Sequence, residues 1–300
     1  MTPLLDISTV IQQAIDAISI GSQYALIALG IALIFGIMRL INFAHGELIM
    51  VGGFTLWKLA NPPWPVLIIA TVGIAAIVAL VMERAAFRPV RNANPATLLV
   101  TSFGLSYLLQ NLSVLVFGAE QRGVQLPQLV TEQFFVGDVR IPKLNVITTV
   151  TAVVLLAALW AFLKYTPLGI QMRASAEDFR MSRLLGVKAN RVISSAFVIS
   201  GALAGVVAIL LISQTGTIQS DIGLQPVLIG LVATVIGGIG SLPGAAVGGF
   251  ILGGATEALD VGLPADLRVF RDAFLFGLVI VILLFRPQGL FGGRSAVVRV

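Results

Sequence analysis

The sequence predicts an all-α polytopic membrane protein. Of its 300 residues, 57% are hydrophobic and only 11% are charged, and the mean hydropathy is +1.00. A soluble fold of this size would need far more polar surface. Six stretches contain no acidic, basic or histidine residue, and each has at least about 18 residues, enough for a helix to cross a bilayer. They cover residues 17–38, 59–82, 92–119, 144–162, 192–220 and 222–256. The runs are continuously apolar instead of alternating, which predicts helices and not barrel strands.

The first apolar stretch is expected to remain as a helix. Asp6 and Asp16 stand near it where a signal peptide would carry Lys or Arg, so a cleaved leader is not expected. The next segment, 47–59, is short for a full crossing. If it crosses, the N-terminus is outside and there are about nine helices. If it is re-entrant, the N-terminus is inside and there are about eight.

The basic residues predict which loops face the cytoplasm. Segments 83–94 and 164–191 are rich in Arg and Lys, and Arg286, Arg294 and Arg299 lie near the C-terminus, so these parts are expected inside. The charges of loop 118–143 balance, which predicts an external loop, and 214–221 and 260–272 are expected outside as well. The net charge of +5 therefore reflects topology and does not indicate a nucleic-acid partner.

Segment 224–259 lies between two expected external loops and must enter the membrane and return. The run GGIGSLPGAAVGG, 237–249, interrupts it with glycines and a proline, which predicts two short or discontinuous helices that meet near residues 241–243. Glycines also recur four residues apart, a spacing that lets helix backbones approach closely. The pairs are Gly201 with Gly205, Gly244 with Gly248, and Gly249 with Gly253.

The chain offers little for bond chemistry. It has no Cys and no G-x-x-x-x-G-K-[ST] motif, so no catalytic residue, metal site or cofactor is expected in it, and any ATP would be used by a separate subunit. His45 and Glu47 have the H-x-E spacing of zinc deaminases, but that chemistry needs a Cys pair. A capping and packing cluster is the preferred interpretation. Apart from these two and Glu257, the long spans lack the acid-base groups that ion-coupled carriers use.

A polar stripe marks the stretch from 92 to 119. Ser102, Ser106, Gln110 and Ser113 recur at spacings of four, four and three, so they share one helix face. Such groups usually bond one helix to another, which is the favoured interpretation. The alternative is a wall of the path for a neutral substrate.

Three segments together resemble a known family. They are GSQYALIALGIALIFGIMRLINFAHGELIMVGGF at 21–54, RASAEDFRMSRLLGVKANRV at 173–192, and GGIGSLPGAAVGG at 237–249 with the closing FRPQGLFG at 285–292. The most specific part is the core NFAHGE at 42–47. These segments resemble the branched-chain amino acid permeases of bacterial ABC importers, and the chain length is similar to the shorter, LivH-type subunit.

The resemblance implies a set of partners and sites. It implies a LivM-type permease subunit, two cytoplasmic ATPases of the LivG/LivF type that use ATP and magnesium, and a periplasmic binding protein, in a bacterial inner membrane. Segment 164–191 would be the cytoplasmic coupling segment. The expected coupling residues are Ala176, Glu177, Asp178, Arg180, Arg183, Leu184, Leu185 and Gly186, and the expected path residues are Asn42, His45, Glu47, Ser102, Ser106 and Gln110.

Local chemistry agrees with the coupling role. Glu177 and Asp178 are predicted at the start of a short helix, where its dipole favours negative charge, and Gly186 is predicted to end it. Met181, Leu184 and Leu185 would offer an apolar edge to an ATPase groove, with Arg180 and Arg183 beside it. The alternative is an amphipathic loop on the lipid headgroups.

The expected function is therefore transport by a single permease domain, 1–300, and not enzymatic catalysis. Branched-chain or other hydrophobic amino acids are the expected cargo, moved by alternating access. Urea or a short-chain amide is the main alternative, since those permeases are close relatives of the same family. An ATP-independent channel or carrier is a less favoured alternative, and an intramembrane enzyme is the least favoured.

Overall fold

Nine helices of 14 or more residues make up most of the computed structural model, which describes residues 7–59, 63–125, 127, 130 and 132–291. These helices are α1 (Ile7–Met38), α2 (His45–Lys58), α3 (Trp64–Met82), α5 (Pro95–Phe117), α7 (Lys143–Tyr165), α10 (Ala189–Thr215), α11 (Leu224–Gly237), α12 (Leu242–Gly262) and α13 (Arg271–Phe285). The shorter helical elements are the π-helix η1 (Glu83–Phe87), α4 (Arg88–Val90), α8 (Pro167–Glu177), α9 (Phe179–Leu184) and the 3-10 helix η2 (Ala265–Phe270). Four short strands complete the described part: β1 (Arg122–Gly123), β2 (Gln133–Val136), β3 (Val139–Pro142) and β4 (Thr217–Ile218).

Six helices are long and apolar enough to cross a membrane, so the chain is a multi-pass membrane protein. They are 7–38, 64–90, 95–117, 143–165, 189–215 and 242–262. Helices α2 and α11 have 14 residues each, about 21 Å at 1.5 Å per residue, which is shorter than a bilayer core of about 30 Å. The prediction that the segment after 47 is short is confirmed.

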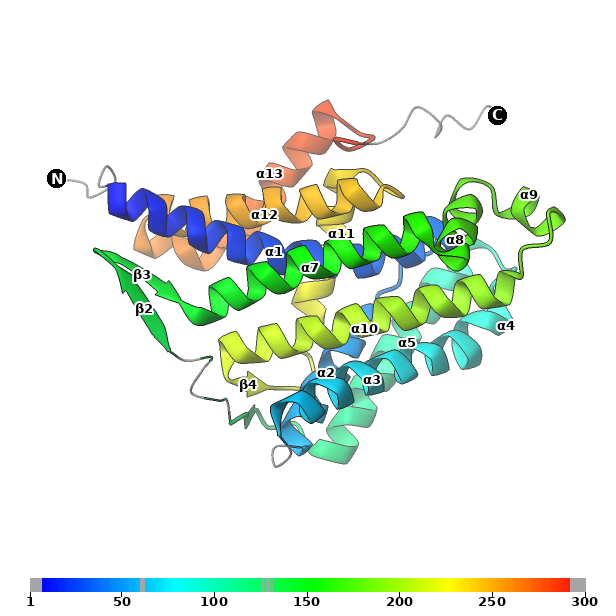
Figure 1. The fold of residues 1–300 in the computed structure, drawn as a ribbon, viewed down its shortest axis with the longest axis horizontal. Helices are drawn as coiled ribbons and strands as arrows, with labels where there is room; N and C mark the ends of the chain where they lie inside the picture. Colours follow the sequence, from blue (N-terminus) through cyan, green and yellow to red (C-terminus); the bar gives the residue numbers. More distant parts are fainter. Residues whose placement is uncertain (1–6, 60–62, 126, 128–129, 131, 292–300) are drawn as a thin grey trace.

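The two ends of the bundle carry different segments of the chain (Figure 1). We call the end that carries 83–94, α8 and α9 the basic end. The start of α1 and the β2–β3 hairpin lie at the opposite end. Helix α1 runs to the basic end, α2 returns to contact β4, and α3 runs to the basic end again. The chain therefore reverses direction twice before Glu83, although α2 by itself is shorter than a bilayer core.

Helix α1 is the central element, packed by α7, α10, α11 and α12. The glycine pairs lie at contacts between helices, as predicted. Gly249 and Gly253 of α12 face α1 at Ala25 and Gly21, with no room for a side chain between the backbones. Likewise, Gly201 and Gly205 face α3, and Gly244 and Gly248 face α11. Small residues thus set the distances between helices throughout the core.

The predicted break in the C-terminal half is confirmed. Helix α11 ends at Gly237 and α12 begins at Leu242. Between them, Ser241 caps α12, since its Oγ accepts a hydrogen bond of 3.1 Å from the Gly244 N–H. The chain after α13 returns to this turn, where the Leu290 N–H donates to the Ile236 carbonyl at 2.7 Å.

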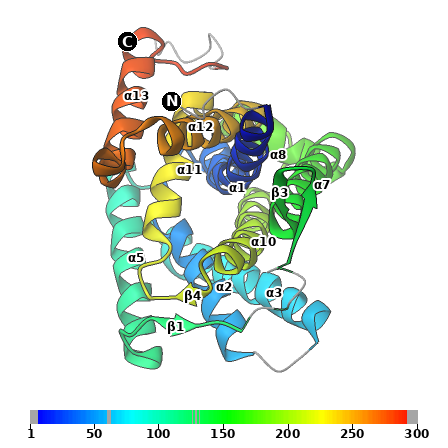
Figure 2. The ribbon, with the colours of Figure 1, turned by 90° about the vertical axis from the view of Figure 1, so that its left-hand side faces the viewer.

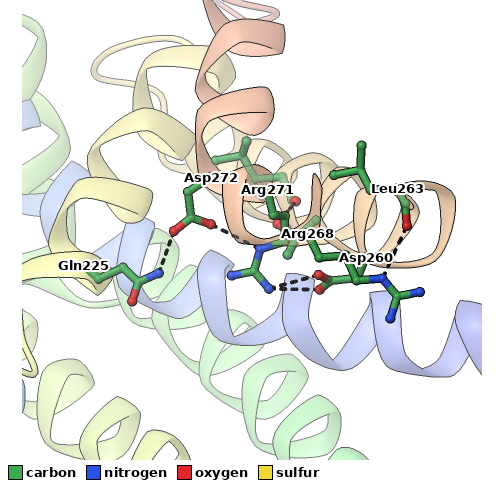
Figure 3. A network of polar contacts seen from close by, with 8 residues as sticks. Gln225, Asp260, Leu263, Arg268, Arg271 and Asp272 are labelled. Atoms are coloured by element: carbon green, nitrogen blue, oxygen red, sulfur yellow. Dashed lines mark hydrogen bonds and ion pairs between the residues drawn. The ribbon is translucent and has the colours of Figure 1, made fainter. Parts of the chain in front are cut away.

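The segments expected outside gather at the opposite end. Strand β1 pairs with β4, and the Arg140 N–H of β3 donates to Gln12 Oε1 of α1 at 3.0 Å. A polar network there joins three helices (Figure 3). Arg271 at the start of α13 donates to both carboxylate oxygens of Asp260 on α12, at 2.9 and 3.2 Å, and to Asp272 at 3.1 Å. Gln225 of α11 donates to Asp272 at 3.0 Å.

Candidate functional site

The NFAHGE segment forms the turn into α2. Asn42 Oδ1 accepts a hydrogen bond of 3.1 Å from the Ala44 N–H, which folds the chain just before the helix begins at His45. Gly46 lies against Gly223, the residue before α11, so closely that a Cβ on either would overlap the other's backbone. Glycine at both positions therefore lets the starts of two short helices meet inside the bundle.

His45 bonds α2 to two central helices. Its ring is buried, and Nδ1 lies 3.1 Å from the Ser200 hydroxyl of α10. That hydroxyl donates to the Gly30 carbonyl of α1 at 2.8 Å, so Nδ1 is the donor to Ser200. A Cβ on Gly30 would lie 2.7 Å from the ring. In the described residues no group of three or more metal-capable side chains is found.

Glu47 is the partner of the polar stripe on α5. Its Oε1 accepts from Ser106 Oγ at 2.7 Å and from Gln110 Nε2 at 2.8 Å. Its Oε2 is buried without a hydrogen-bond partner in the described part of the chain. Ser102 completes the stripe by bonding the Leu99 carbonyl at 2.8 Å and reaching the Ile41 carbonyl at 3.3 Å. The stripe bonds one helix to another, which agrees with the favoured interpretation.

The outer face of α5 is apolar and exposed. Its buried residues are Leu98, Ser102, Ser106 and Ser113, so the usual pattern is inverted and the polar side faces the protein. Tyr107 and Leu115 on the other side are 72% and 83% exposed. Figure 2 shows α5 at the edge of the bundle. This face can contact lipid or a second membrane subunit.

The predicted coupling segment projects from the basic end as α8 and α9 (Figure 1). Asp178 caps α9, where its Oδ1 accepts from the Met181 N–H at 2.8 Å. Glu177 is instead the last residue of α8, so the prediction that both acids begin one helix is right for Asp178 and wrong for Glu177. A single residue in extended conformation, Asp178, separates the two helices.

The apolar edge of α9 is exposed as predicted. Met181, Leu184 and Leu185 are 53%, 77% and 81% exposed, and Arg180 and Arg183 lie exposed beside them. Ala176 differs from the other coupling candidates because it is partly buried against the core near Gly36 of α1. Ser175 of α8 and Ser182 of α9 bond to each other at 3.3 Å. The coupling segment is thus anchored to the bundle through α8, whereas the apolar edge of α9 is exposed.

Gly186 ends α9 in a left-handed turn. Its φ is +89°, its N–H donates to the Arg183 carbonyl, and the Val187 N–H donates to the Ser182 carbonyl, both at 3.1 Å. This is the Schellman pattern, in which glycine avoids the steric cost that other residues pay at positive φ. The prediction that Gly186 ends the helix is confirmed.

Replacing Gly186 tests the backbone conformation directly, because nothing lies within 4 Å of a Cβ built there. We expect Gly186→Val to destabilise the turn by about 1–2 kcal/mol and to lower transport while the protein still inserts into the membrane. Gly186→Asn should retain more activity, since Asn tolerates positive φ. Uptake and membrane-fraction abundance would be measured together. Equal, normal uptake by both variants would contradict the role of this turn.

Sequence reasoning missed a second polar cluster at the basic end. Glu83 is buried, accepts two hydrogen bonds of 3.1 Å from Arg88, and accepts one of 2.8 Å from Ser194 of α10. Arg91 bonds Asn190, one turn earlier on α10. A spacing of five residues does not bring side chains together on an α-helix, but the π-helix Glu83–Phe87 does. In the sequence, this cluster was therefore visible only as charged residues within one loop.

Comparison with known proteins agrees with this architecture. The family described as "Branched-chain amino acid transport system / permease component" matches residues 13–284. The chain belongs to this permease family. It is 36% identical over 298 residues to the high-affinity branched-chain amino acid transport system permease protein BraD of Pseudomonas aeruginosa. The match covers 94% of this chain and 95% of that protein. The LivH permease of Escherichia coli K12 matches at 36% identity with the same coverage.

Members of this permease family are transport components, and the resemblance to the family is confirmed. A more distant relative is the autoinducer 2 import system permease protein LsrD of Salmonella choleraesuis, 25% identical over 292 residues, with 93% of this chain and 84% of that protein covered. Sequence relatives of this chain therefore include a permease whose name states a different cargo.

Proposed function

We propose that this chain is a permease subunit of an ABC importer for branched-chain amino acids in a bacterial inner membrane. The observation that carries the proposal is α9, whose apolar edge is exposed at the basic end of a permease-family bundle. An exposed edge of Met181, Leu184 and Leu185 between arginines suits a groove on a second protein. The proposed partners are two ATPases of the LivG/LivF type, a LivM-type permease and a periplasmic binding protein.

The contact between α8 and α1 suggests how movement of the coupling segment would reach the substrate path. Ala176 lies near Gly36 of α1, and α1 packs against α10, α11 and α12. A shift of α8 and α9 driven by ATPase closure would be transmitted along these packed helices. The starts of α2 and α11 meet within the bundle, and Asn42, His45, Glu47, Ser102, Ser106 and Gln110 lie around the start of α2. In the proposal, this region lines or shapes the path when the bundle opens.

This role needs no bond chemistry in the chain. ATP and magnesium would act in the ATPase subunits, and the permease would supply the path and the mechanical link. The side chains near the start of α2 would serve binding and packing, so no catalytic residue, metal or cofactor is proposed here. Membrane lipid surrounds the bundle.

The test is ATP-dependent uptake by proteoliposomes that contain the chain, its genomically adjacent permease, both ATPases and the binding protein. We expect leucine to accumulate only when ATP is on the ATPase side. Leu184→Ser/Leu185→Ser should reduce both uptake and retention of the ATPases at least tenfold. The matched control is Leu284→Ser/Phe285→Ser, since that pair at the end of α13 is also exposed, at 79% each.

Each other result would change the proposal in a defined way. Urea or short-chain amide uptake without leucine uptake would move the cargo to that branch of the family. Uptake that continues without ATP would indicate a channel or carrier. Equal loss in both double variants would contradict the role of α9.

A further inference from the structure

A cavity of about 560 Å³ opens at the basic end between α3 with η1, the junction of α7 and α8, and the start of α10. Its polar and cationic lining residues include Arg84, Arg88 and Arg191. Its apolar lining residues include Phe162 and Val198. These apolar residues belong to the membrane-spanning helices, whereas the arginines lie where those helices end. The cavity thus crosses from the hydrocarbon level to the headgroup level.

The charges in the cavity are not balanced. Arg88 is paired with Glu83 through a bidentate contact, so these two charges offset each other. Arg84 and Arg191 are exposed, and neither guanidinium has a hydrogen bond or ion pair in the described part of the chain. Two unneutralised guanidinium groups therefore share the cavity with apolar side chains. Arg84 is the second residue of η1, which directly follows α3, and Arg191 lies in the first turn of α10.

We infer that this cavity binds one anionic phospholipid. Arg84 and Arg191 would bind its phosphate and headgroup, because guanidinium groups donate paired hydrogen bonds to phosphate oxygens. The amide of Asn190 lies in the same lining, and its N–H groups offer a further polar contact. An acyl chain would follow the apolar wall toward the bilayer interior. Basic pockets between membrane helices have this form when they hold lipid headgroups.

Because of where the cavity lies, a bound lipid would affect how the helices are held together. Asn190 and Arg191 lie in the first turn of α10, shortly after the turn at Gly186, so the cavity lies where the α8–α9 segment rejoins the bundle. Arg91 also bonds Asn190 from the 83–94 loop. A lipid held here would tie the end of α3 to the start of α10. This inference concerns binding by the chain itself and does not depend on the proposed cargo.

Native mass spectrometry of the purified chain, exchanged from detergent into phosphatidylglycerol or phosphatidylcholine, tests the inference. We expect one phosphatidylglycerol to remain bound in preference to phosphatidylcholine. Arg84→Gln/Arg191→Gln removes two charges near the headgroup and should weaken retention about 30-fold. Arg286→Gln is the matched control, because Arg286 is also an exposed arginine but does not line the cavity. It follows α13, a helix that packs against α11 and α12.

The competing sources of a phosphate group are separated in the same experiment. Glycerophosphoglycerol, the headgroup without acyl chains, and inorganic phosphate are each added in excess. Retention of the intact lipid against both supports a lipid site. Displacement by either compound, with the same dependence on Arg84 and Arg191, would show a soluble anion site and overturn the inference. Equal binding of both lipids, or equal loss in the Arg286 control, would overturn it as well.

Discussion

Gly253→Ala is expected to be among the most damaging single substitutions in this protein. A Cβ at Gly253 would overlap the Cα and backbone nitrogen of Gly21, so no side-chain rotation can relieve the clash. Helices α1 and α12 would have to separate, and α1 is central to the bundle. We expect a loss of about 3 kcal/mol of stability, the upper range for an overpacked core. Thermal unfolding in detergent and the yield of monodisperse protein would measure it.

The neighbouring residue supplies a matched control. Gly254 lies on the same helix, and nothing is found within 4 Å of a Cβ built there. Gly254→Ala therefore adds the same methyl group to the same helix without a clash. Its stability should stay the same or rise slightly, because alanine favours helix over glycine. If both variants unfolded at the same temperature, the close contact between α1 and α12 would be refuted.

Glu47→Ala is expected to detach α5 from the rest of the bundle. The substitution removes the acceptor of both the Ser106 hydroxyl and the Gln110 amide, and it leaves their donors unsatisfied next to a buried site. Each lost bond to such a group costs roughly 1–3 kcal/mol, so a total of about 3 kcal/mol is expected. Helix α5 has few other contacts with the core, apart from α2 and η1. Its amides should exchange hydrogen faster in the variant.

Glu47→Gln separates the bonding role from the charge. Its amide oxygen can still accept from Ser106 and Gln110, so stability should return to near that of the wild type. Transport by this variant then reports on the carboxylate itself. Full stability with lost uptake would assign Glu47 to the path, whereas normal uptake would restrict it to packing. A stable Glu47→Ala variant with slow exchange in α5 would contradict the structural role.

Several features were predictable because they depend on residues close together in the sequence. Long charge-free runs predict spans, the loops of Arg and Lys predict a common side, and the glycines and proline of 237–249 predict a break. The turn at Gly186 is similarly local, since helix termination depends on one residue's permitted φ and two backbone hydrogen bonds. Glycine pairs four residues apart predict close packing, but they do not name the facing helix.

Other features depend on which helices become neighbours. The polar stripe on α5 was visible in the sequence, but its partner Glu47 lies 59 residues away from Ser106. His45 meets Ser200 only because α2 inserts beside α10, and Glu83 meets Arg88 only because of a π-helical turn. The correction at Glu177 concerns a helix boundary, since the extended residue Asp178 ends α8 and caps the start of α9.

The sequence by itself determined that this protein crosses the membrane several times, which end is basic, where its helices break, and the family to which its motifs belong. Hydropathy, charge and backbone preference act over a few residues, so they can be read along the chain. Only the tertiary structure decided that α2 begins against α11, that Glu47 holds α5, and that Arg84 and Arg191 share one cavity. Those pairings are set by the packing of distant helices around α1, because small residues and buried hydrogen bonds select one arrangement among many that the local pattern permits.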